Sequence, residues 1–441
     1  PRSTLFPYTT LFRSVTEINL NSLRYVNSLK FIDGTLFLCA DNGVGFLEDG
    51  VFSLLETGSF NNSIDNMTED YQGNLWFTSS RLGLLKMCET SFTEIYASSG
   101  LPISVVNTTS FFNGNLYFGT DDGLMAVDSI KNQSLQNALT TLLSGVRVRC
   151  LMTAKDGSLW IATKQKALIH ATTDGKIENY GKGKQFRVVT ELSDGSICAG
   201  TNDGVIFIKD GKIIQELSSK DGFENPTILS LSQTPDGKIL AGTDGGGLAI
   251  IEDFKITRLI KRTNGLSSNV VIRTVNDYDG NEPTGGVFVV TSNGLCYLEF
   301  SARSERKGNV ARPLSNFPFS NNYDIIVREN KNVFVLSSAG IFVVNRNELL
   351  SGQKVDYELL DLKKGLRGSL TANSWNYLSE NGDLYLSCDT GSSVVNLNTY
   401  DKNEHSFRMQ IKSVLLDGKR HIVQKDIPFT IPADCRSEER H

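Results

Sequence analysis

The sequence is poor in the residue types that build metal sites, disulfide frameworks and most catalytic centres. Its four histidines are dispersed, and its seven cysteines show no CxxC spacing, so neither a zinc site nor a set of disulfides is indicated. The formal net charge of -5 gives no basic surface for nucleic acid or for an anionic membrane. We therefore expect no metal, no cofactor, no nucleic-acid partner and no catalytic residue in this chain.

Proline is also scarce, at 10 residues, whereas glycine is abundant at 39. This combination suits a chain with many tight turns and does not suit a disordered linker. The hydrophobic content of 39% and the charged content of 21% are those of an ordinary soluble globular protein. The composition indicates an all-β protein.

Both ends of the chain resemble a translated sequencing adapter. Residues 4–14 read TLFPYTTLFRS, and codons for residues 11–14 have a reverse complement that encodes residues 436–439. Such scars are set aside before the fold is considered. We expect residues 1–14 and 435–441 to be adapter-derived and both natural termini to be lost, so that the lack of a signal peptide or membrane helix says nothing about location.

One sequence motif recurs about nine times, and its clearest copy is Asn113–Val127. Each copy carries a large apolar residue at a separation of roughly 38 to 51 residues, which is the span of one four-stranded propeller blade. Six positions later, a glycine stands in seven of the nine copies. The residues at the large apolar position are Phe37, Trp76, Tyr117, Trp160, Cys198, Leu240, Phe288, Phe334 and Tyr385.

Each copy reads as four strands. A β-branched run such as residues 270–275 precedes an Asp-Gly or Asn-Gly turn, and an apolar strand such as residues 159–162 follows it. A third strand, as at residues 204–208, and a polar–apolar alternation, as at residues 255–260, complete the copy. One such sheet cannot bury both faces, so the pattern predicts a closed ring of stacked blades, a β-propeller.

Nine copies exceed the four to eight blades of most propellers. We predict a seven-bladed propeller over residues 101–405 and, over residues 15–100, two blades of a truncated N-terminal propeller, with the junction at residues 100–102. A single ring of eight or nine blades is the alternative. Residues 406–434 alternate weakly and then resume an extended run with edge-type prolines, which predicts the start of a β-sandwich.

The repeat resembles the two-component-regulator propeller family, whose pattern is an Asp-x-x-Gly turn followed by Leu-Trp-Ile-Gly-Thr. The matching segments are residues 69–78, 156–163 and 236–243, and residues 412–419 resemble the start of a triple-tyrosine immunoglobulin-like domain. Copies with Cys198 or Leu240 in place of tryptophan depart from the pattern. A single copy is therefore a poor match to the family, and only the whole periodic set of copies resembles it specifically.

The resemblance implies an extracytoplasmic ligand-sensing module of a membrane signal-transduction protein. Its output domain would be a diguanylate cyclase or a histidine kinase, its membrane attachment would lie in missing segments, and the full-length protein could form a homodimer. The implied ligand is a small molecule or an oligosaccharide. Binding would bias the docking of the ring on the sandwich that follows it.

The loops that precede first strands and those that join second to third strands are expected to share one end of the ring. Exposed aromatic and amide side chains on such loops suit a saccharide. The candidate ligand-binding residues on these loops are Arg81, Asn269, Tyr323, Asn373 and Trp375.

Two other functions remain open. A propeller enzyme, either a glycoside hydrolase or a lyase, would need paired acids at the channel. Residues 156–160 resemble an aspartate box, but Ala154 replaces its Ser or Thr, and residues 277–280 resemble a calcium loop without the acidic twelfth ligand. Gly245–Gly247 lacks the Lys-Ser/Thr of a phosphate loop. The remaining alternative is an intracellular scaffold that binds protein partners on its rim.

Overall fold

The computed structural model describes residues 17–20, 22–70, 73–88, 90–300, 311–328, 332–400, 413–422, 430 and 438–440. The chain divides into two compact units, one of residues 90–403 and the other of residues 1–89 with 404–441. Antiparallel sheets, most of them four-stranded, make up nearly all the regular structure of the described residues. The prediction of an all-β fold built from four-stranded blades is confirmed.

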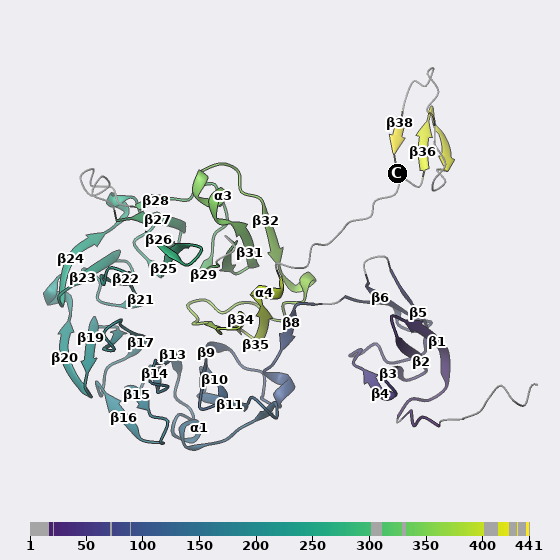
Figure 1. The fold of residues 1–441 in the computed structure, drawn as a ribbon, viewed down its shortest axis with the longest axis horizontal. Helices are drawn as coiled ribbons and strands as arrows, with labels where there is room; N and C mark the ends of the chain where they lie inside the picture. Colours follow the sequence, from purple (N-terminus) through teal and green to yellow (C-terminus); the bar gives the residue numbers. More distant parts are fainter. Residues whose placement is uncertain are drawn as a thin grey trace, which may run out of the picture. The chain divides into compact units, whose positions relative to one another are not determined.

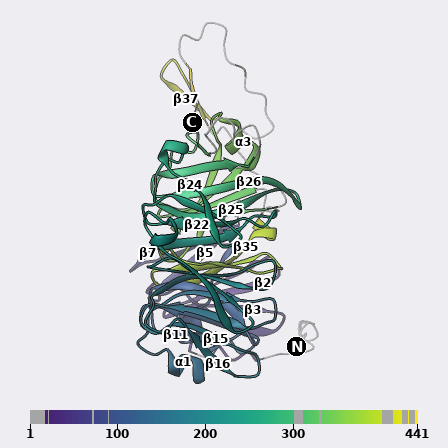
Figure 2. The same cartoon turned by 90° about the vertical axis from the view of Figure 1, so that its left-hand side faces the viewer.

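Residues 90–403 form a ring of seven blades, with the first strand of most blades nearest the centre (Figure 1). Seen from the side, sheets that are successive in the chain lie one above another (Figure 2). The first four blades comprise β9 (Val106–Phe112), β10 (Asn115–Thr120), β11 (Leu124–Asp128) and β12 (Gln133–Ser134); β13 (Val148–Thr153), β14 (Leu159–Thr163), β15 (Leu168–Ala171) and β16 (Ile177–Tyr180); β17 (Phe186–Glu191), β18 (Ile197–Thr201), β19 (Val205–Lys209) and β20 (Lys212–Leu217); and β21 (Ile228–Gln233), β22 (Ile239–Thr243), β23 (Leu248–Glu252) and β24 (Lys255–Ile260).

The last three blades follow the same order, except that the seventh takes its outer strand from before the first blade. They comprise β25 (Val271–Asp279), β26 (Glu282–Thr291), β27 (Gly294–Glu299) and β28 (Ala311–Pro313); β29 (Asn322–Val327), β30 (Asn332–Ser337), β31 (Gly340–Asn345) and β32 (Tyr357–Leu360); and β33 (Tyr377–Leu378), β34 (Asp383–Cys388), β35 (Gly391–Asn396) and β8 (Phe92–Glu94).

Short helices occupy some of the connections. None of the helices described is long and apolar enough to cross a membrane. They are α1 (Ala138–Leu142), α3 (Arg346–Ser351) and α4 (Leu397–Tyr400), with the 3-10 turns η2 (Ala97–Ser99), η3 (Ser219–Asp221), η4 (Arg262–Asn264) and η5 (Leu362–Lys364).

The blades hold together through apolar residues on both of their faces. The second strands β14, β18 and β22 are buried along their whole lengths. One hydrophobic cluster runs through blades 2, 3 and 4, and its members include Phe186, Phe207 and Ile228, all fully buried. Burying one such side chain stabilises the fold by about 1.5–3 kcal/mol. Stacking between blades is therefore the main source of stability.

The ring is closed by β8, whose residues Phe92, Thr93 and Glu94 pair antiparallel with Val395, Val394 and Ser393 of β35. The Phe92 side chain, only 6% exposed, packs into the cluster formed by blades 6 and 7. The Glu94 carboxylate accepts hydrogen bonds from the amides of residues 96, 97 and 98 at 2.7–2.8 Å, which fixes the turn into η2. A strand from the start of the unit thus completes its last blade.

Because β8 belongs to the ring, the observed domain boundary lies earlier in the chain than the predicted one. The sequence placed the junction at residues 100–102, whereas the ring begins at Thr90. The reason is that β8 is the fourth strand of the second repeat when the repeats are counted along the chain, but it pairs with β35 of the ninth. The sheet of the second repeat consequently has three described strands, β5 (Ile64–Glu69), β6 (Leu75–Ser79) and β7 (Gly83–Met87).

The other unit contains this three-stranded sheet and a four-stranded one of β1 (Val26–Ile32), β2 (Thr35–Ala40), β3 (Gly43–Glu48) and β4 (Val51–Leu55). The two sheets share a core that includes Cys39, Ile64 and Phe77. A third sheet consists of β36 (Ser413–Leu416), β37 (Lys419–Ile422) and β38 (Glu438–Arg440), the last within the segment expected to be adapter-derived. Most of residues 406–434 lie outside the described residues, so the β-sandwich stays a prediction.

A buried ion pair joins blade 5 to blade 6. The Asp277 carboxylate accepts hydrogen bonds from the Arg346 guanidinium at 2.6 and 2.5 Å, from the Tyr297 hydroxyl at 2.6 Å and from the Thr284 hydroxyl at 2.9 Å. Burial raises the pKa of Tyr297 to about 12. The segment that resembles a calcium loop therefore holds a structural carboxylate whose oxygens are already engaged.

Phe92→Ala should open the ring at its closure. The loss of a buried aromatic ring costs about 3–5 kcal/mol, so we expect a lower midpoint of denaturant unfolding and faster amide exchange in β35. Leu84→Ala in β7 is the control, since Leu84 is 59% exposed. Equal effects of the two substitutions would contradict the role of β8 in closure.

The cysteines report on the cores of both units. Among the described residues Cys88 is exposed, five cysteines are buried, and none forms a disulfide. Burial raises the pKa of Cys150 and of Cys388 to about 12, so neither is a thiolate at neutral pH. We expect iodoacetamide to label Cys88 in the native protein and the five buried thiols only after unfolding, as measured by peptide mass spectrometry. Rapid native labelling of Cys150 would show that the ring opens there.

Candidate functional site

The end of the ring at which the first strands begin, here called the leading end, gathers loops from all blades. In blades 2 to 6 the residue after the second strand donates its backbone N–H to the residue before the first strand of the same blade. Examples are Lys164 to Arg147 at 3.0 Å, Asn202 to Gln185 at 3.2 Å and Asp244 to Thr227 at 2.9 Å. The two kinds of loop therefore lie together, as expected, and any side chain between them faces this end.

A β-bulge at the start of six first strands in the ring supplies such a side chain. In each case one residue is skipped in the pairing with the second strand, as Arg149 is between Val148 and Cys150. A bulge leaves one residue unpaired and re-aims its side chain. In blades 1 to 6 the skipped residues are Asn107, Arg149, Arg187, Leu229, Ile272 and Tyr323.

The first three of these residues make a polar, cationic arc. Asn107 donates to Asp121 at 2.8 Å and to the Val148 carbonyl of the next blade at 3.2 Å. Asp121 also pairs with Arg147, with 2.8 Å between Oδ1 and Nε. These contacts satisfy Asp121 and leave the two arginines at the bulges, Arg149 and Arg187, without a carboxylate partner.

Neither of these two arginines makes an ion pair within the described part of the chain. Arg187 donates from Nε to the amide oxygen of Asn202 at 2.5 Å, and the Nε of Arg149 is buried with no hydrogen-bond acceptor. Burial, and then the charges of Arg187 and Arg147, lower the pKa of Arg149 to about 10. Burial also lowers the pKa of Arg187. The charges of neighbouring arginines thus oppose one another at this end of the ring.

The remaining three bulge residues, Leu229, Ile272 and Tyr323, form an apolar arc on the other side of the ring. All three are partly exposed. Blades 4 to 6 lie across the ring from blades 1 to 3 (Figure 1). Ile272 packs in part against the hydrophobic cluster of blades 5 and 6, and Tyr323 against that of blades 6 and 7. A ligand that touched both arcs would need an acidic part and an apolar part.

A loop of blade 7, residues 371–376, fills the centre just beneath the bulges. Trp375 donates its N–H to the Asn107 carbonyl at 2.8 Å and accepts from Thr109 at 3.1 Å, so the loop pairs with β9 of blade 1. Its indole packs against the hydrophobic cluster of blades 2 to 4. Through this loop the last blade contacts blade 1 and the cluster of blades 2 to 4.

A buried arginine is stacked on that indole. The Arg273 guanidinium carbon lies 3.5 Å from the centroid of the Trp375 ring, a cation–π contact. Its Nε donates to Asp324 at 3.1 Å and its Nη2 to the Ser374 carbonyl, while Asn376 donates to the second Asp324 oxygen at 3.2 Å. Arg273 is 4% exposed. Blades 5, 6 and 7 are thus joined through the Arg273 guanidinium and the Asp324 carboxylate.

The structure places the residues predicted from sequence in different settings. Tyr323 is at a bulge of the leading end, and Asn373 and Trp375 belong to the loop that fills the channel, with Asn373 exposed and left-handed at a φ of 56°. Asn269 also lies at this end, but its side-chain oxygen accepts from the Arg262 amide at 2.9 Å. Arg81 is in the β6–β7 turn of the other unit and is not part of the ring.

The sequence prediction missed Arg147, Arg149 and Arg187. A signal for two of them was present, because Arg149 and Arg187 each stand eleven positions before the large apolar residue of their repeat. When two neighbouring copies of the repeat carry arginine at the same position, the two cations lie on neighbouring blades of the ring. Only the bulge indicates that the side chains at this repeat position face the end of the ring and not a neighbouring blade.

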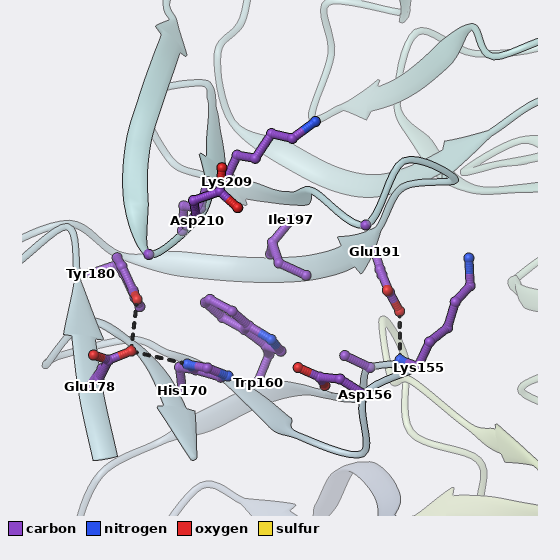
Figure 3. A pocket seen from close by; sticks show the side chains of 14 residues that line it. Lys155, Asp156, Trp160, His170, Glu178, Tyr180, Glu191, Ile197, Lys209 and Asp210 are labelled. Atoms are coloured by element: carbon purple, nitrogen blue, oxygen red, sulfur yellow. Dashed lines mark hydrogen bonds and ion pairs between the residues drawn. The ribbon is translucent and has the colours of Figure 1, made fainter. Parts of the chain in front are cut away.

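A separate cavity of 510 Å³ lies between blades 2 and 3 at the opposite ends of the first strands (Figure 3). The His170 ring stacks on Trp160 with centroids 4.2 Å apart, and its Nδ1 lies 3.4 Å from Glu178. Hydrogen bonds from Lys176, Tyr180 and His170 lower the pKa of Glu178 to about 2. Those from Ser158 lower the pKa of Asp156.

This cavity gives no support to glycoside hydrolysis. A general acid for that reaction needs a carboxyl group with a raised pKa, whereas the pKa values of Glu178 and Asp156 are both lowered. Glu191, on the same wall, accepts from the Lys155 amide at 2.8 Å (Figure 3). Within the described ranges no group of three or more His, Cys, Asp or Glu side chains could hold a metal ion.

Arg149→Met should stabilise the ring, since it removes a repelled charge and keeps the apolar stem. Solvent screening keeps the gain small, and we expect a rise in Tm of about 1–2 °C by calorimetry. Asp324→Asn should do the opposite and cost about 3–5 kcal/mol, because it leaves Arg273 buried without its carboxylate. A fall in Tm for Arg149→Met matching that of Asp324→Asn would show that Arg149 is structural.

No family model matches the chain, and neither does any curated protein. Among solved structures, the extracellular domain of the hybrid two-component system protein BT3049 of B. thetaiotaomicron has a TM-score of 0.72 at 20% sequence identity, over 95% of this chain and 56% of its own. That of BT4673 from the same organism has a TM-score of 0.57 at 16% identity, over 91% of this chain and 57% of its own. The chain spans just over half the length of these neighbours, and at these identities the likeness establishes the propeller fold alone.

Proposed function

We propose that this chain is the extracytoplasmic ligand-sensing propeller module of a membrane signal-transduction protein whose output is a histidine kinase or a diguanylate cyclase. The observation that carries the proposal is the pair of half-buried arginines without carboxylate partners, Arg149 and Arg187, above the Arg273–Trp375 stack. Groups left unpaired in this way are costly for a protein that binds nothing there. Two solved propellers of similar fold are extracellular domains of two-component system proteins, which supports the same assignment.

The fold offers a route from ligand to output through blade 7. This blade carries the loop with Trp375, which sits beneath the leading end, and it is completed by β8. The chain enters the ring at β8 and leaves it after α4, which follows the last strand of the same blade (Figure 1). A ligand that pulled on the Arg273–Trp375 stack would bias the one blade that both flanking segments adjoin, and a ligand shifts an equilibrium only through such differential contacts.

The gene that encodes this segment tests the proposal. Sequenced beyond the codon for Asp434, it should encode a further β-domain, an apolar span of about 20 residues and then a kinase or cyclase domain. A protease added outside intact cells should cleave the propeller and spare the output domain. A stop codon soon after Asp434, or a hydrolase domain in place of the membrane span, would overturn the proposal.

A further inference from the structure

We propose that the cavity between blades 2 and 3 binds an organic cation that also carries a carbonyl group, as a lysine residue of a peptide does. The cavity lies at the opposite end of the ring from the leading end, and the proposal does not depend on the proposed function. It follows from the size of the cavity, from an indole N–H without an acceptor and from carboxylates without ion pairs.

The cavity has the size of a site for a small organic molecule. Its volume is 510 Å³, and ligand pockets typically measure about 300–1,000 Å³. Blade 2 contributes Asp156, Trp160 and Tyr180 to its lining, and blade 3 contributes Glu191 and Asp210 (Figure 3). Since no group of three or more ligating side chains within the described ranges could hold a metal ion, an organic ligand fits this space better.

The Trp160 indole offers a hydrogen-bond donor that no described residue uses. Trp160 is 5% exposed and lines the cavity. In the second repeat Trp76 occupies the same position, and its Nε1 donates to the Asp70 carboxylate, six positions earlier, at 2.8 Å. Six positions before Trp160 stands Ala154, whose methyl group accepts no hydrogen bond. Because buried donors normally have a partner, a carbonyl oxygen of a ligand would complete this one.

The turns that contain Asp70 and Ala154 have the same backbone geometry. The Asp70 N–H donates to the Asn74 carbonyl at 2.9 Å, and the Ala154 N–H donates to the Ser158 carbonyl at 2.8 Å. The indole of blade 2 therefore lacks a partner because of one side chain and not because the turn differs.

Three carboxylates line the same cavity without an ion pair to any described residue. Asp156 uses Oδ1 to accept from the Ser158 amide at 2.9 Å and hydroxyl at 2.6 Å, and these bonds lower its pKa. Glu191 uses Oε2 to accept from the Lys155 amide. Asp210 lies exposed in the turn between β19 and β20. Oxygens of all three groups thus remain for a bound cation.

The lysines near the cavity do not balance these charges. Lys209 is paired with Asp194, with 2.8 Å between Nζ and Oδ2. Glu178, the fourth carboxylate of the lining, is paired with Lys176 at 2.7 Å. Lys155 is then the one cation of the described lining without an ion pair. Three carboxylates face one such lysine, so the lining attracts a positive charge.

The side chains are oriented to receive that charge beside the indole. In Figure 3 the Asp156 carboxylate points toward Trp160, whereas the ammonium groups of Lys155 and Lys209 point away from it. The Trp160 and Tyr180 rings have centroids 5.4 Å apart. Aromatic faces attract organic cations, so rings and carboxylates favour the same ligand class.

Titration calorimetry on the whole chain tests this with three probes. Nα-acetyl-lysine methylamide has the ammonium and the carbonyl groups, its Nε-acetylated form has the same skeleton without the charge, and butylamine has the ammonium without a carbonyl. We expect the lysine amide to bind at least tenfold more tightly than either of the others, with an affinity that falls as salt rises. Equal affinity of butylamine would instead indicate a free amine as the ligand and overturn the proposal.

Charge variants assign the binding to the named carboxylates. Asp156→Asn, Glu191→Gln and Asp210→Asn should each weaken binding of the lysine amide by about threefold, the effect of a partly exposed ion pair, and the triple variant should weaken it at least tenfold. Asp253→Asn is the matched control, because Asp253 is exposed in the same turn of blade 4, with a φ of 49° against 48° for Asp210. It should leave the affinity unchanged.

Trp160→Phe tests the indole N–H. Phenylalanine occupies this repeat position at Phe288 and Phe334, so the blade should tolerate it. We expect the affinity for the lysine amide to fall to that for butylamine, while the affinity for butylamine stays the same. Tm and circular dichroism show whether each variant is folded.

The inference would be overturned if the folded chain bound the lysine amide and its acetylated form equally, or bound neither. Binding that survived the triple substitution, or that Asp253→Asn weakened as much as Asp210→Asn, would also contradict it. None of these results touches the proposed function, whose failure would appear in the gene sequence and the protease test.

Discussion

The pairing of β8 with β35 is the contact on which the rest of the ring depends. Each blade has two apolar faces, and both are buried only if every blade has a neighbour on each side. Three residues from ahead of the first blade meet this requirement by completing the last one, with Phe92 in the core between blades 6 and 7. The same closure brings Trp375 of blade 7 against β9 of blade 1. The closure of the ring and the position of the Trp375 loop thus depend on the same contact between the last blade and the first.

The bulges turn a repetitive scaffold into a specific surface. A regular first strand would direct its side chains only into the contacts between blades, whereas one skipped residue per strand aims a side chain at the leading end. In the first blade this residue, Asn107, ties the blade to the next through the Val148 carbonyl. In the next two blades arginines replace that tie and repel each other. The ring accepts this local cost because its stability comes from stacking elsewhere.

The similarity to solved propellers and the geometry of the leading end answer different questions. The neighbours share the fold at 20% identity or less, so they do not say which residues act. The arginines without carboxylate partners, on the first strands of blades 2 and 3, and the stack of Arg273 of blade 5 on Trp375 of blade 7 are observed in this chain itself. Blade 7, at which the chain enters and leaves the ring, carries the loop with Trp375.

The sequence by itself determined the repeat, the four strands of each blade and the all-β propeller, because glycine turns and strand alternation are local patterns that recur at blade spacing. Of the ligand-binding candidates it indicated, Asn269, Tyr323, Asn373 and Trp375 lie in the ring, and their role in binding stays a prediction. Only the tertiary structure decided that β8 belongs to the seventh blade, since strand order along the chain does not reveal which edge a strand covers. Only the tertiary structure likewise separated Arg81 from the ring and showed that Arg149 and Arg187 have no carboxylate partner. Strand register and ion pairs depend on contacts between strands and blades, which the order of residues along the chain does not reveal.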